Sequence, residues 1–225
     1  MFIVLVSYRA RHVQQFRRGE IIRAIENFKT YFHKNNIEYK IVISEQNNDL
    51  KFNRGLLLNV AFLESEKIFA FPKKYMHMNT DYLFDLSRLF PPELSDSTKN
   101  GFIDLHRPPY PVLGAACVFD ADSYRTINGF PNDLEGWGGD DWAIYNRIVQ
   151  HHIPLHTPIG LFNSNFINEQ IVLFGNDQSN NRKNEELAKR NDSKYNGLNS
   201  ITYGLDGYGE FHDGEVVFHY LVGYL

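Results

Sequence analysis

The sequence predicts an α/β fold in which a mixed, mostly parallel central sheet is flanked by helices. The chain opens with a continuous apolar run, Phe2 to Val6, which is typical of a strand buried on both faces. A helical pattern follows, with apolar side chains at Ile21, Ile25, Phe28 and Phe32. Strand and helix signals then continue to alternate, which favours a parallel sheet that binds its ligand at the carboxyl ends of its strands.

The same signals predict the next elements in chain order. Residues 39–44 are expected to form a strand, and residues 53–63 a helix with one apolar side. Residues 68–71 and 75–78 are strand-like, and Leu113 to Phe119 is a further buried strand.

The last part of the chain is more polar. Residues 163–196 are rich in Asn, Asp and Lys, so part of this segment is expected to be a mobile loop. Beyond Ser200, aromatic strand-like segments around Asp213-Gly214 predict a closing hairpin. No internal repeat or linker is visible, so residues 1–225 are predicted to form a single domain.

Composition limits the function classes. A net charge of −4 and a pI near 6.1 argue against a nucleic-acid partner. No apolar run is long enough to cross a bilayer, and residues 1–7 lack the basic lead and cleavage site of a signal peptide. Cys117 is the single cysteine and lies in an apolar run, so it is expected in the core. These features predict a cytoplasmic protein with no membrane span and no intramolecular disulfide.

The most informative stretch is residues 136–141, where glycines around Trp137 precede the adjacent acids Asp140 and Asp141. Trp142, Ile144, Tyr145, Ile148 and Val149 recur at three- and four-residue spacing, which predicts a helix through residue 150. A capped helix with an acidic first turn would explain the acids alone. The glycines permit close backbone approach, and an aromatic beside a carboxylate suits a sugar ring. Successive helix residues point about 100° apart, so the two acids are expected to have different roles.

These residues and four further blocks resemble the β-1,4-galactosyltransferase family, glycosyltransferase family 7. The signature N-G-F-P-N…W-G-W-G-G-E-D-D-D-I-F-N-R is similar to residues 128–147. The other blocks match in order: S-Y-R-A-R (7–11) with P-F-R-x-R, residues 52–62 with F-N-R-A-x-L-L-N-V-G-F, R-K-N-E (182–185) with K-K-N-E, and residues 197–203 with G-L-N-S-L-T-Y.

The resemblance implies a GT-A-type fold and an inverting transferase. Such an enzyme moves a hexose or N-acetylhexosamine from a UDP-sugar to a saccharide or glycoconjugate hydroxyl, and forms a β-linkage. The alternative is a catalytically weak or inactive protein that binds nucleotide sugars. A glycoside hydrolase is rejected, because its two carboxylates flank the scissile bond roughly 5 to 9 Å apart and adjacent helix residues do not face each other across a sugar.

The resemblance also implies a metal site. Asp81 matches the second Asp of the family's Asp-x-Asp, a ligand of the Mn²⁺ that bridges the donor diphosphate, whereas Asn79 replaces the first. The family's histidine ligand falls on Gln178 in an ungapped count, with Asp177 one step away. Oxygen ligands suit Mn²⁺ or Mg²⁺, and we expect binding to be weak because charged or imidazole partners are replaced. Without the resemblance, the sequence favours a structural role for Asp81 in an Asx turn at the end of the strand.

The resemblance assigns the remaining site residues to donor and acceptor. Arg9, Arg11, Phe52 and Arg54 are implied to cradle the uridine and diphosphate, for which guanidinium groups are suited. Arg107 is a further phosphate-binding candidate from its location alone. Trp137 is implied to lie between donor and acceptor, with Gly138 as a further substrate-binding residue, and Asp140 and Asp141 are implied to bind acceptor hydroxyls.

Asp141 matches the family's general base. A free aspartate is ionised at neutral pH and can accept the acceptor's proton. Val112 falls where a family tyrosine helps to select galactose, so a roomier donor pocket is expected and the donor remains open between Gal, GalNAc and GlcNAc. Residues 176–184 lie where the family has a loop that closes over bound donor, and composition alone equally suits an ordinary solvated loop.

Overall fold

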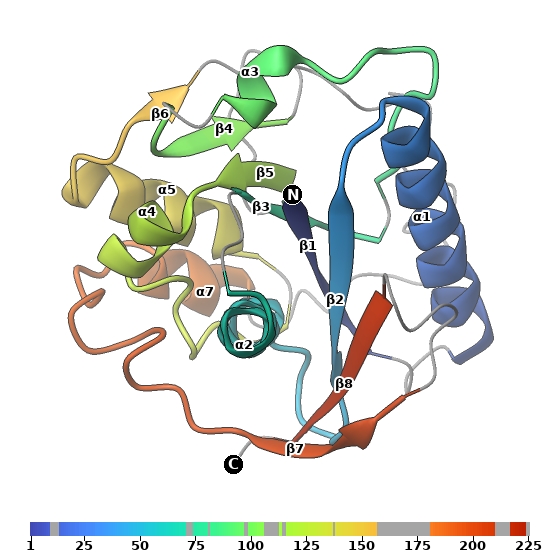
Figure 1. Cartoon of the computed structure of the whole chain (residues 1–225). Coiled ribbons are helices and arrows are strands. Elements are labelled where there is room, and N and C mark those ends of the chain that lie inside the picture. The colour runs from blue at the N-terminus through green and yellow to red at the C-terminus, as the bar shows by residue number, and fades with distance from the viewer. Residues whose placement is uncertain are drawn as a thin grey trace.

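The computed structural model describes residues 1–9, 14–70, 74–80, 82–96, 99–105, 113, 116–136, 138–156, 181–209 and 217–223. One eight-stranded sheet runs through it in the order β6-β4-β5-β3-β1-β2-β8-β7 (Figure 1). The strands are β1 (Phe2–Tyr8), β2 (Tyr39–Gln46), β3 (Lys74–Met78), β4 (Phe102–Asp104), β5 (Ala116–Phe119), β6 (Leu155–His156), β7 (Gly204–Tyr208) and β8 (Val217–Gly223).

The centre of the sheet is parallel and its flanks are mixed. β1 pairs in parallel with β2 and with β3, and β2 pairs in parallel with β8. β5 runs antiparallel to β3 and β4, and β7 runs antiparallel to β8. This arrangement confirms the predicted mixed, mostly parallel α/β sheet, and it confirms the C-terminal hairpin of β7 and β8; its predicted turn at 213–214 lies outside the described residues.

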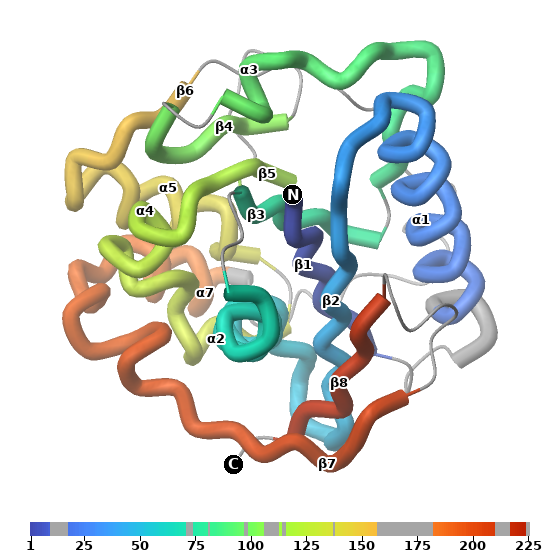
Figure 2. The backbone as a smooth tube through the Cα atoms, in the orientation of Figure 1, coloured from blue at the N-terminus to red at the C-terminus, as the bar shows by residue number. Residues whose placement is uncertain are grey.

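Helices cover both faces of the sheet. The helices are α1 (Gln14–Lys34), α2 (Arg54–Ile68), α3 (Pro92–Ser95), α4 (Ala121–Thr126), α5 (Asp140–Gln150) and α7 (Asn181–Leu187). In the tube view α1 lies alone on one side of β1 and β2, whereas α2, α4, α5 and α7 gather on the other (Figure 2).

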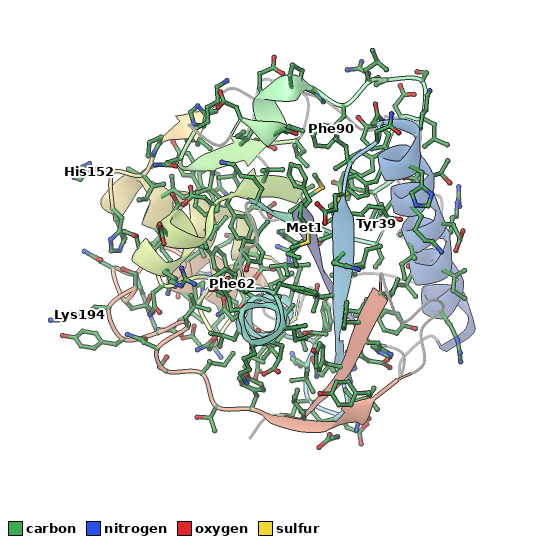
Figure 3. The ribbon with its side chains drawn as sticks, in the orientation of Figure 1. Met1, Tyr39, Phe62, Phe90, His152 and Lys194 are labelled. Atoms are coloured by element: carbon green, nitrogen blue, oxygen red, sulfur yellow. The ribbon has the colours of Figure 1, made fainter. Side chains whose placement is uncertain are left out.

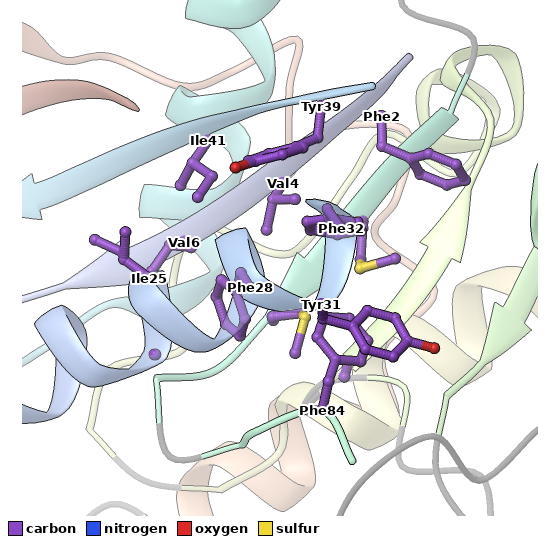
Figure 4. Packing of buried hydrophobic residues seen from close by; sticks show 14 of the residues in the cluster. Phe2, Val4, Val6, Ile25, Phe28, Tyr31, Phe32, Tyr39, Ile41 and Phe84 are labelled. Carbon is purple, nitrogen blue, oxygen red and sulfur yellow. The ribbon is translucent and has the colours of Figure 1, made fainter. Parts of the chain in front are cut away.

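The strand alternation of β1 divides the core into two layers. Val4 and Val6 face α1 in an aromatic-rich layer, in which the rings of Tyr31 and Phe84 stack with centroids 4.1 Å apart (Figure 4). Ile3 and Leu5 belong to the second layer, under α2, α4 and α5. Phe62 of α2, labelled in Figure 3, belongs to this layer. Its ring centroid lies 4.8 Å from those of Tyr75 and Tyr124. Cys117 is buried in this second layer, as the sequence predicts.

Three boundary predictions are wrong. Residues 68–70 are not a strand, because α2 continues to Ile68 and residues 69–70 connect it onward. Leu113 lies in a turn, and β5 begins at Ala116. Residues 181–184, expected in a mobile or solvated loop, form the first turn of α7, where Asn184 is buried.

The parallel strands bring several segments to one edge of the sheet. Arg9 follows β1 and Asn79 follows β3, while the Phe52–Asn53 segment between β2 and α2 lies at the same end. Asn53 caps α2 by accepting a hydrogen bond from the Leu56 amide at 2.9 Å. The polar residues that follow β1, β2 and β3 therefore lie together at the edge of the sheet where a ligand is expected.

Candidate active site

The segment before α5 is shaped by glycines with left-handed backbone. Gly136, Gly138 and Gly139 have φ of 79°, 96° and 86°. Gly139 is also the N-cap of α5, and a Cβ built on it would lie 2.7 Å from the carbonyl oxygen of Asn184. The glycines therefore let this segment turn sharply and pack against α7, as their number around residue 137 suggested.

We expect Gly139→Ala to destabilise the protein by about 1–3 kcal/mol, because an alanine would be strained at this φ and would collide with the α7 backbone. The measurement is the free energy of unfolding from a denaturant titration. Gly19→Ala is the matched control, since its new Cβ would meet no atom within 4 Å in the helix α1. Equal stability of both variants would contradict this account of the turn.

The two acids that open α5 have different environments. Both lie in its first turn, as the sequence predicts. The Asp140 side chain is 10% exposed and the Asp141 side chain is 42% exposed. The Oδ1 atom of Asp140 is buried and has no hydrogen-bond partner within the described residues. Asp141 can therefore meet a ligand from solvent, whereas Asp140 faces the interior.

Arg54 joins these acids to the end of β3. Its Nη2 lies 3.0 Å from Oδ2 of Asp140 and 3.4 Å from Oδ1 of Asp141, and its Nη1 donates to Oδ1 of Asn79 at 3.1 Å. The Arg54 side chain is 13% exposed, so its contact with the buried Asp140 carboxylate is largely shielded from solvent. The resemblance implied a phosphate contact for Arg54, and the structure adds that it holds the acidic pair.

Burial sets the protonation of Asp140. It raises the pKa of that carboxyl to about 6, against the lowering effect of Arg54 and with a further rise from Asp141. Because the folded pKa lies above the unfolded value near 3.9, the native state holds the proton more tightly. The resulting stabilisation is present below about pH 4 and is lost as pH rises through 6.

We therefore expect wild type to lose at most about 3 kcal/mol of unfolding free energy relative to Asp140→Asn between pH 4 and pH 7. The measurement is a series of urea titrations of both proteins across this range. Asp122→Asn, which removes a 95% exposed carboxylate from α4, controls for the loss of one charge. A constant difference between wild type and Asp140→Asn would show that Asp140 titrates alike in both states.

Arg9 provides a second cationic group at this edge. Its Nε and Nη2 atoms are buried and have no hydrogen-bond partner within the described residues. Buried guanidinium donors are normally matched by an acceptor, so this arrangement suits an incoming anion. Phe52, which follows β2, packs partly buried against the second core layer, and its carbonyl oxygen accepts from the Gly136 amide at 2.7 Å.

Several predicted site residues fall outside the part of the chain that the structure describes. They are Arg11, Asp81, Arg107, Val112, Trp137, Asp177 and Gln178. Their assigned roles remain predictions.

The described residues do not form a metal site by themselves. Among them, no group of three or more His, Cys, Asp or Glu side chains could hold a metal ion. Asn79, at the end of β3, already accepts from the positively charged Arg54 through its side-chain oxygen. A divalent ion at this edge would therefore depend on ligands beyond the described residues.

The sequence did not predict that residues of α2 within the signature motifs hold the turn at Phe130 and Pro131. Asn59 of α2 is buried and donates to the Phe130 carbonyl at 2.8 Å, while its Oδ1 accepts from the Phe130 amide at 3.0 Å. Gly55 allows α2 to approach this turn, since a Cβ there would lie 2.9 Å from the carbonyl oxygen of Pro131. The four-residue spacing of Gly55 and Asn59 was the available signal, because it places both on one side of α2.

Comparisons with known proteins identify relatives of this chain. Residues 2–83 match the family described as "N-terminal region of glycosyl transferase group 7", and residues 102–164 match "N-terminal domain of galactosyltransferase". Mouse β-1,4-galactosyltransferase 1 is 27% identical over 179 residues, which cover 74% of this chain and 43% of that protein. The xylosylprotein 4-β-galactosyltransferase of Caenorhabditis elegans is 26% identical over 217 residues, 90% of this chain and 71% of that protein.

Two solved structures share the fold. A mutant of Drosophila β1,4-galactosyltransferase 7 in complex with manganese, UDP-Gal and xylobiose superposes with a TM-score of 0.76 at 17% identity, covering all of this chain and 94% of that one. The catalytic domain of the same enzyme with xylobiose gives 0.76 at 18% identity. These likenesses confirm the predicted GT-A-type fold. The chain spans less than half the length of the mammalian β-1,4-galactosyltransferase 1 relatives.

Proposed function

The chain belongs to the β-1,4-galactosyltransferase family, glycosyltransferase family 7, and from this premise we propose that it is an inverting, UDP-sugar-dependent glycosyltransferase. It would transfer a hexose or N-acetylhexosamine to a hydroxyl of a saccharide or glycoconjugate. The observation that carries the proposal is the half-exposed Asp141 carboxylate beside the buried Arg54–Asp140 pair, at the ligand edge of the sheet.

We assign the role of general base to Asp141, and the exposure of its side chain to solvent supports this assignment. In the proposed reaction the acceptor oxygen attacks the anomeric carbon of the donor, and its proton passes to the Asp141 carboxylate. The bond from that carbon to the UDP oxygen breaks, and its electron pair leaves with the diphosphate. Attack opposite the leaving group inverts an α-linked donor to a β-linked product. Arg54, 3.4 Å from Asp141, holds the carboxylate in place.

Positive charge at the strand ends supports the donor assignment. The buried Nε and Nη2 atoms of Arg9 suit diphosphate oxygens. On the resemblance, we propose that Arg11, Phe52 and Arg107 also contact the donor. Trp137 and Gly138 are proposed to lie between donor and acceptor. Arg54 is already committed to three oxygen partners, so we assign it to orienting the acids in addition to any phosphate contact.

A divalent cation, Mn²⁺ or Mg²⁺, is proposed to neutralise the leaving diphosphate. Asp81, with Asp177 or Gln178, would supply oxygen ligands. Support comes from the Drosophila enzyme that was crystallised with manganese and UDP-Gal. Asn79 is an amide whose oxygen faces Arg54, so the site has one fewer anionic ligand than the family pattern.

We therefore expect weak metal affinity. Titration of Mn²⁺ against UDP binding by calorimetry should give half-saturation well above low micromolar metal. Asn79→Asp should tighten it, because the variant restores a carboxylate. Tight binding by wild type, or full activity in excess EDTA, would each contradict this prediction.

The donor sugar is left open between galactose, N-acetylgalactosamine and N-acetylglucosamine, because Val112 replaces the family's tyrosine. A panel of UDP-sugars with mono- and oligosaccharide acceptors, followed by UDP release and by product mass, tests the whole proposal. Acceptor-dependent release with one donor supports it. UDP-sugar binding without transfer or hydrolysis would instead identify a nucleotide-sugar-binding protein, and no binding at all would reject both.

A further inference from the structure

Helix α5 carries two apolar stripes, one buried and one largely exposed. The sequence pattern does not distinguish the two stripes, because all five apolar residues recur at helical spacing. In the structure Ile144 and Ile148 are buried against the sheet. Trp142 is 63% exposed and Val149 is 53% exposed, with Tyr145 partly exposed between them. Trp142 and Val149 therefore lie outside the core, whereas Tyr145 packs partly buried against its second layer.

The exposed stripe begins with an ordered aromatic pair. The rings of Trp142 and Tyr145 meet edge to face, with centroids 6.2 Å apart and an interplanar angle of 89°. This is a preferred aromatic geometry, so each ring restricts the rotation of the other. We call Trp142 and Tyr145 the aromatic platform.

The platform adjoins the proposed base. Trp142 follows Asp141 directly, and Tyr145 lies four positions further along the same helix. Four residues of an α-helix advance about 400°, so Tyr145 and Asp141 point within about 40° of each other, one turn apart. Since the Trp142 ring contacts the Tyr145 ring, the aromatic platform lies within about one helical turn of Asp141.

We propose that the aromatic platform binds a second sugar ring of the acceptor, next to the ring that receives the transferred sugar. This inference rests on the proposed function and extends it to the acceptor class, an oligosaccharide or other acceptor with at least two rings. An exposed indole offers a flat apolar face to the C–H side of a pyranose, and the Tyr145 hydroxyl and solvent satisfy the sugar hydroxyls.

A macromolecular partner fits this surface less well. Aromatic side chains bury about 150–250 Å² each, so two rings and one valine present at most roughly 500–600 Å². A stable protein interface needs about 800 Å² on each partner. The area matches one or two sugar rings beside the carboxylate, and it is too small for a lasting contact between two copies of the chain.

The test compares one acceptor as a monosaccharide and as the corresponding oligosaccharide. Trp142→Ala should raise KM for the oligosaccharide about tenfold, with kcat within about twofold of wild type and the monosaccharide KM little changed. Trp142→Phe should recover part of the loss. Tyr208→Ala, which removes a 76% exposed aromatic from the sheet-edge strand β7, is the matched control and should change neither KM. Equal losses for both acceptors, or none, would overturn the proposal.

Binding without turnover provides an independent measurement. The chain has two tryptophans, so Trp142 is the single tryptophan of Trp137→Phe, and oligosaccharide should shift the fluorescence of this variant. If no acceptor is glycosylated by any variant, the proposed function fails while this shift still decides whether the platform binds saccharide. Absence of the shift, or a change in oligomeric mass for Trp142→Ala in light scattering, would reject the platform as a sugar site.

Discussion

Asp141→Asn is expected to lower transfer by about 10²–10⁴-fold, the usual contribution of a general base, while UDP binding stays close to wild type. The amide keeps the size of the side chain and can still contact Arg54, but it cannot take the acceptor's proton. Single-turnover transfer with saturating donor and the preferred acceptor measures the loss, and calorimetry measures UDP affinity.

Two comparisons make this result specific. Asp122→Asn changes the same functional group at an exposed position on α4, and it should leave both measurements unchanged. Asp140→Asn keeps the half-exposed carboxylate of Asp141 and should retain more activity than Asp141→Asn. Wild-type turnover by Asp141→Asn would end the general-base assignment. Joint loss of UDP binding and turnover would place Asp141 on the donor side instead.

The fold was predictable where the sequence pattern is long and regular. The buried strand β1 and the helix α5 follow directly from their apolar periods. The strand prediction is wrong for residues 68–70, because a short apolar run fits a helix end as well as a strand. There α2 continues to Ile68, and Lys67 pairs with Glu64 at 2.6 Å within its last turns.

Helix α7 had no comparable local signal. Its sequence, N-R-K-N-E-E-L, is polar, and its place depends on residues far along the chain. Leu187 and the following Ala188 form a small buried cluster with Leu134 and Ala143, and Asn184 donates to the Glu135 carbonyl at 2.9 Å. Such tertiary contacts override composition, and they were invisible to a local reading.

The sequence predicted which residues belong to the candidate site, but not which of them contact one another. Motif resemblance named Arg54, Asp140 and Asp141, but it placed the arginine with the donor and the acids with the acceptor. The structure brings all three within hydrogen-bonding or ion-pair range. Their unequal burial, which separates a buried acid from an accessible one, depends on the glycine turn and on how α2 packs, and no spacing in the sequence encodes it.

Arg147→Ala is expected to produce the largest loss of stability, because Arg147 is 2% exposed and connects two distant segments. Its guanidinium donates to the carbonyl oxygens of Gly129 at 2.8 Å and Asn196 at 2.6 Å, and it pairs with the Asp192 carboxylate at 3.0 Å. Removal of the guanidinium leaves these oxygen acceptors without their donor at a position that is largely shielded from water. Breaking a buried pair in this way costs about 3–5 kcal/mol.

For a chain of this length that loss should lower Tm by roughly 6–20 °C, measured by calorimetry or circular dichroism. Arg182→Ala is the control, since that side chain is 94% exposed, and it should shift the unfolding free energy by no more than about 0.5 kcal/mol. Arg147→Met separates the two parts of the side chain, because it keeps the apolar stem and removes the donors. If the hydrogen bonds hold the Asn128–Gly129 turn to residues 192–196, methionine should not rescue stability. A methionine variant as stable as wild type would show that packing of the stem, and not the guanidinium, stabilises this part of the fold.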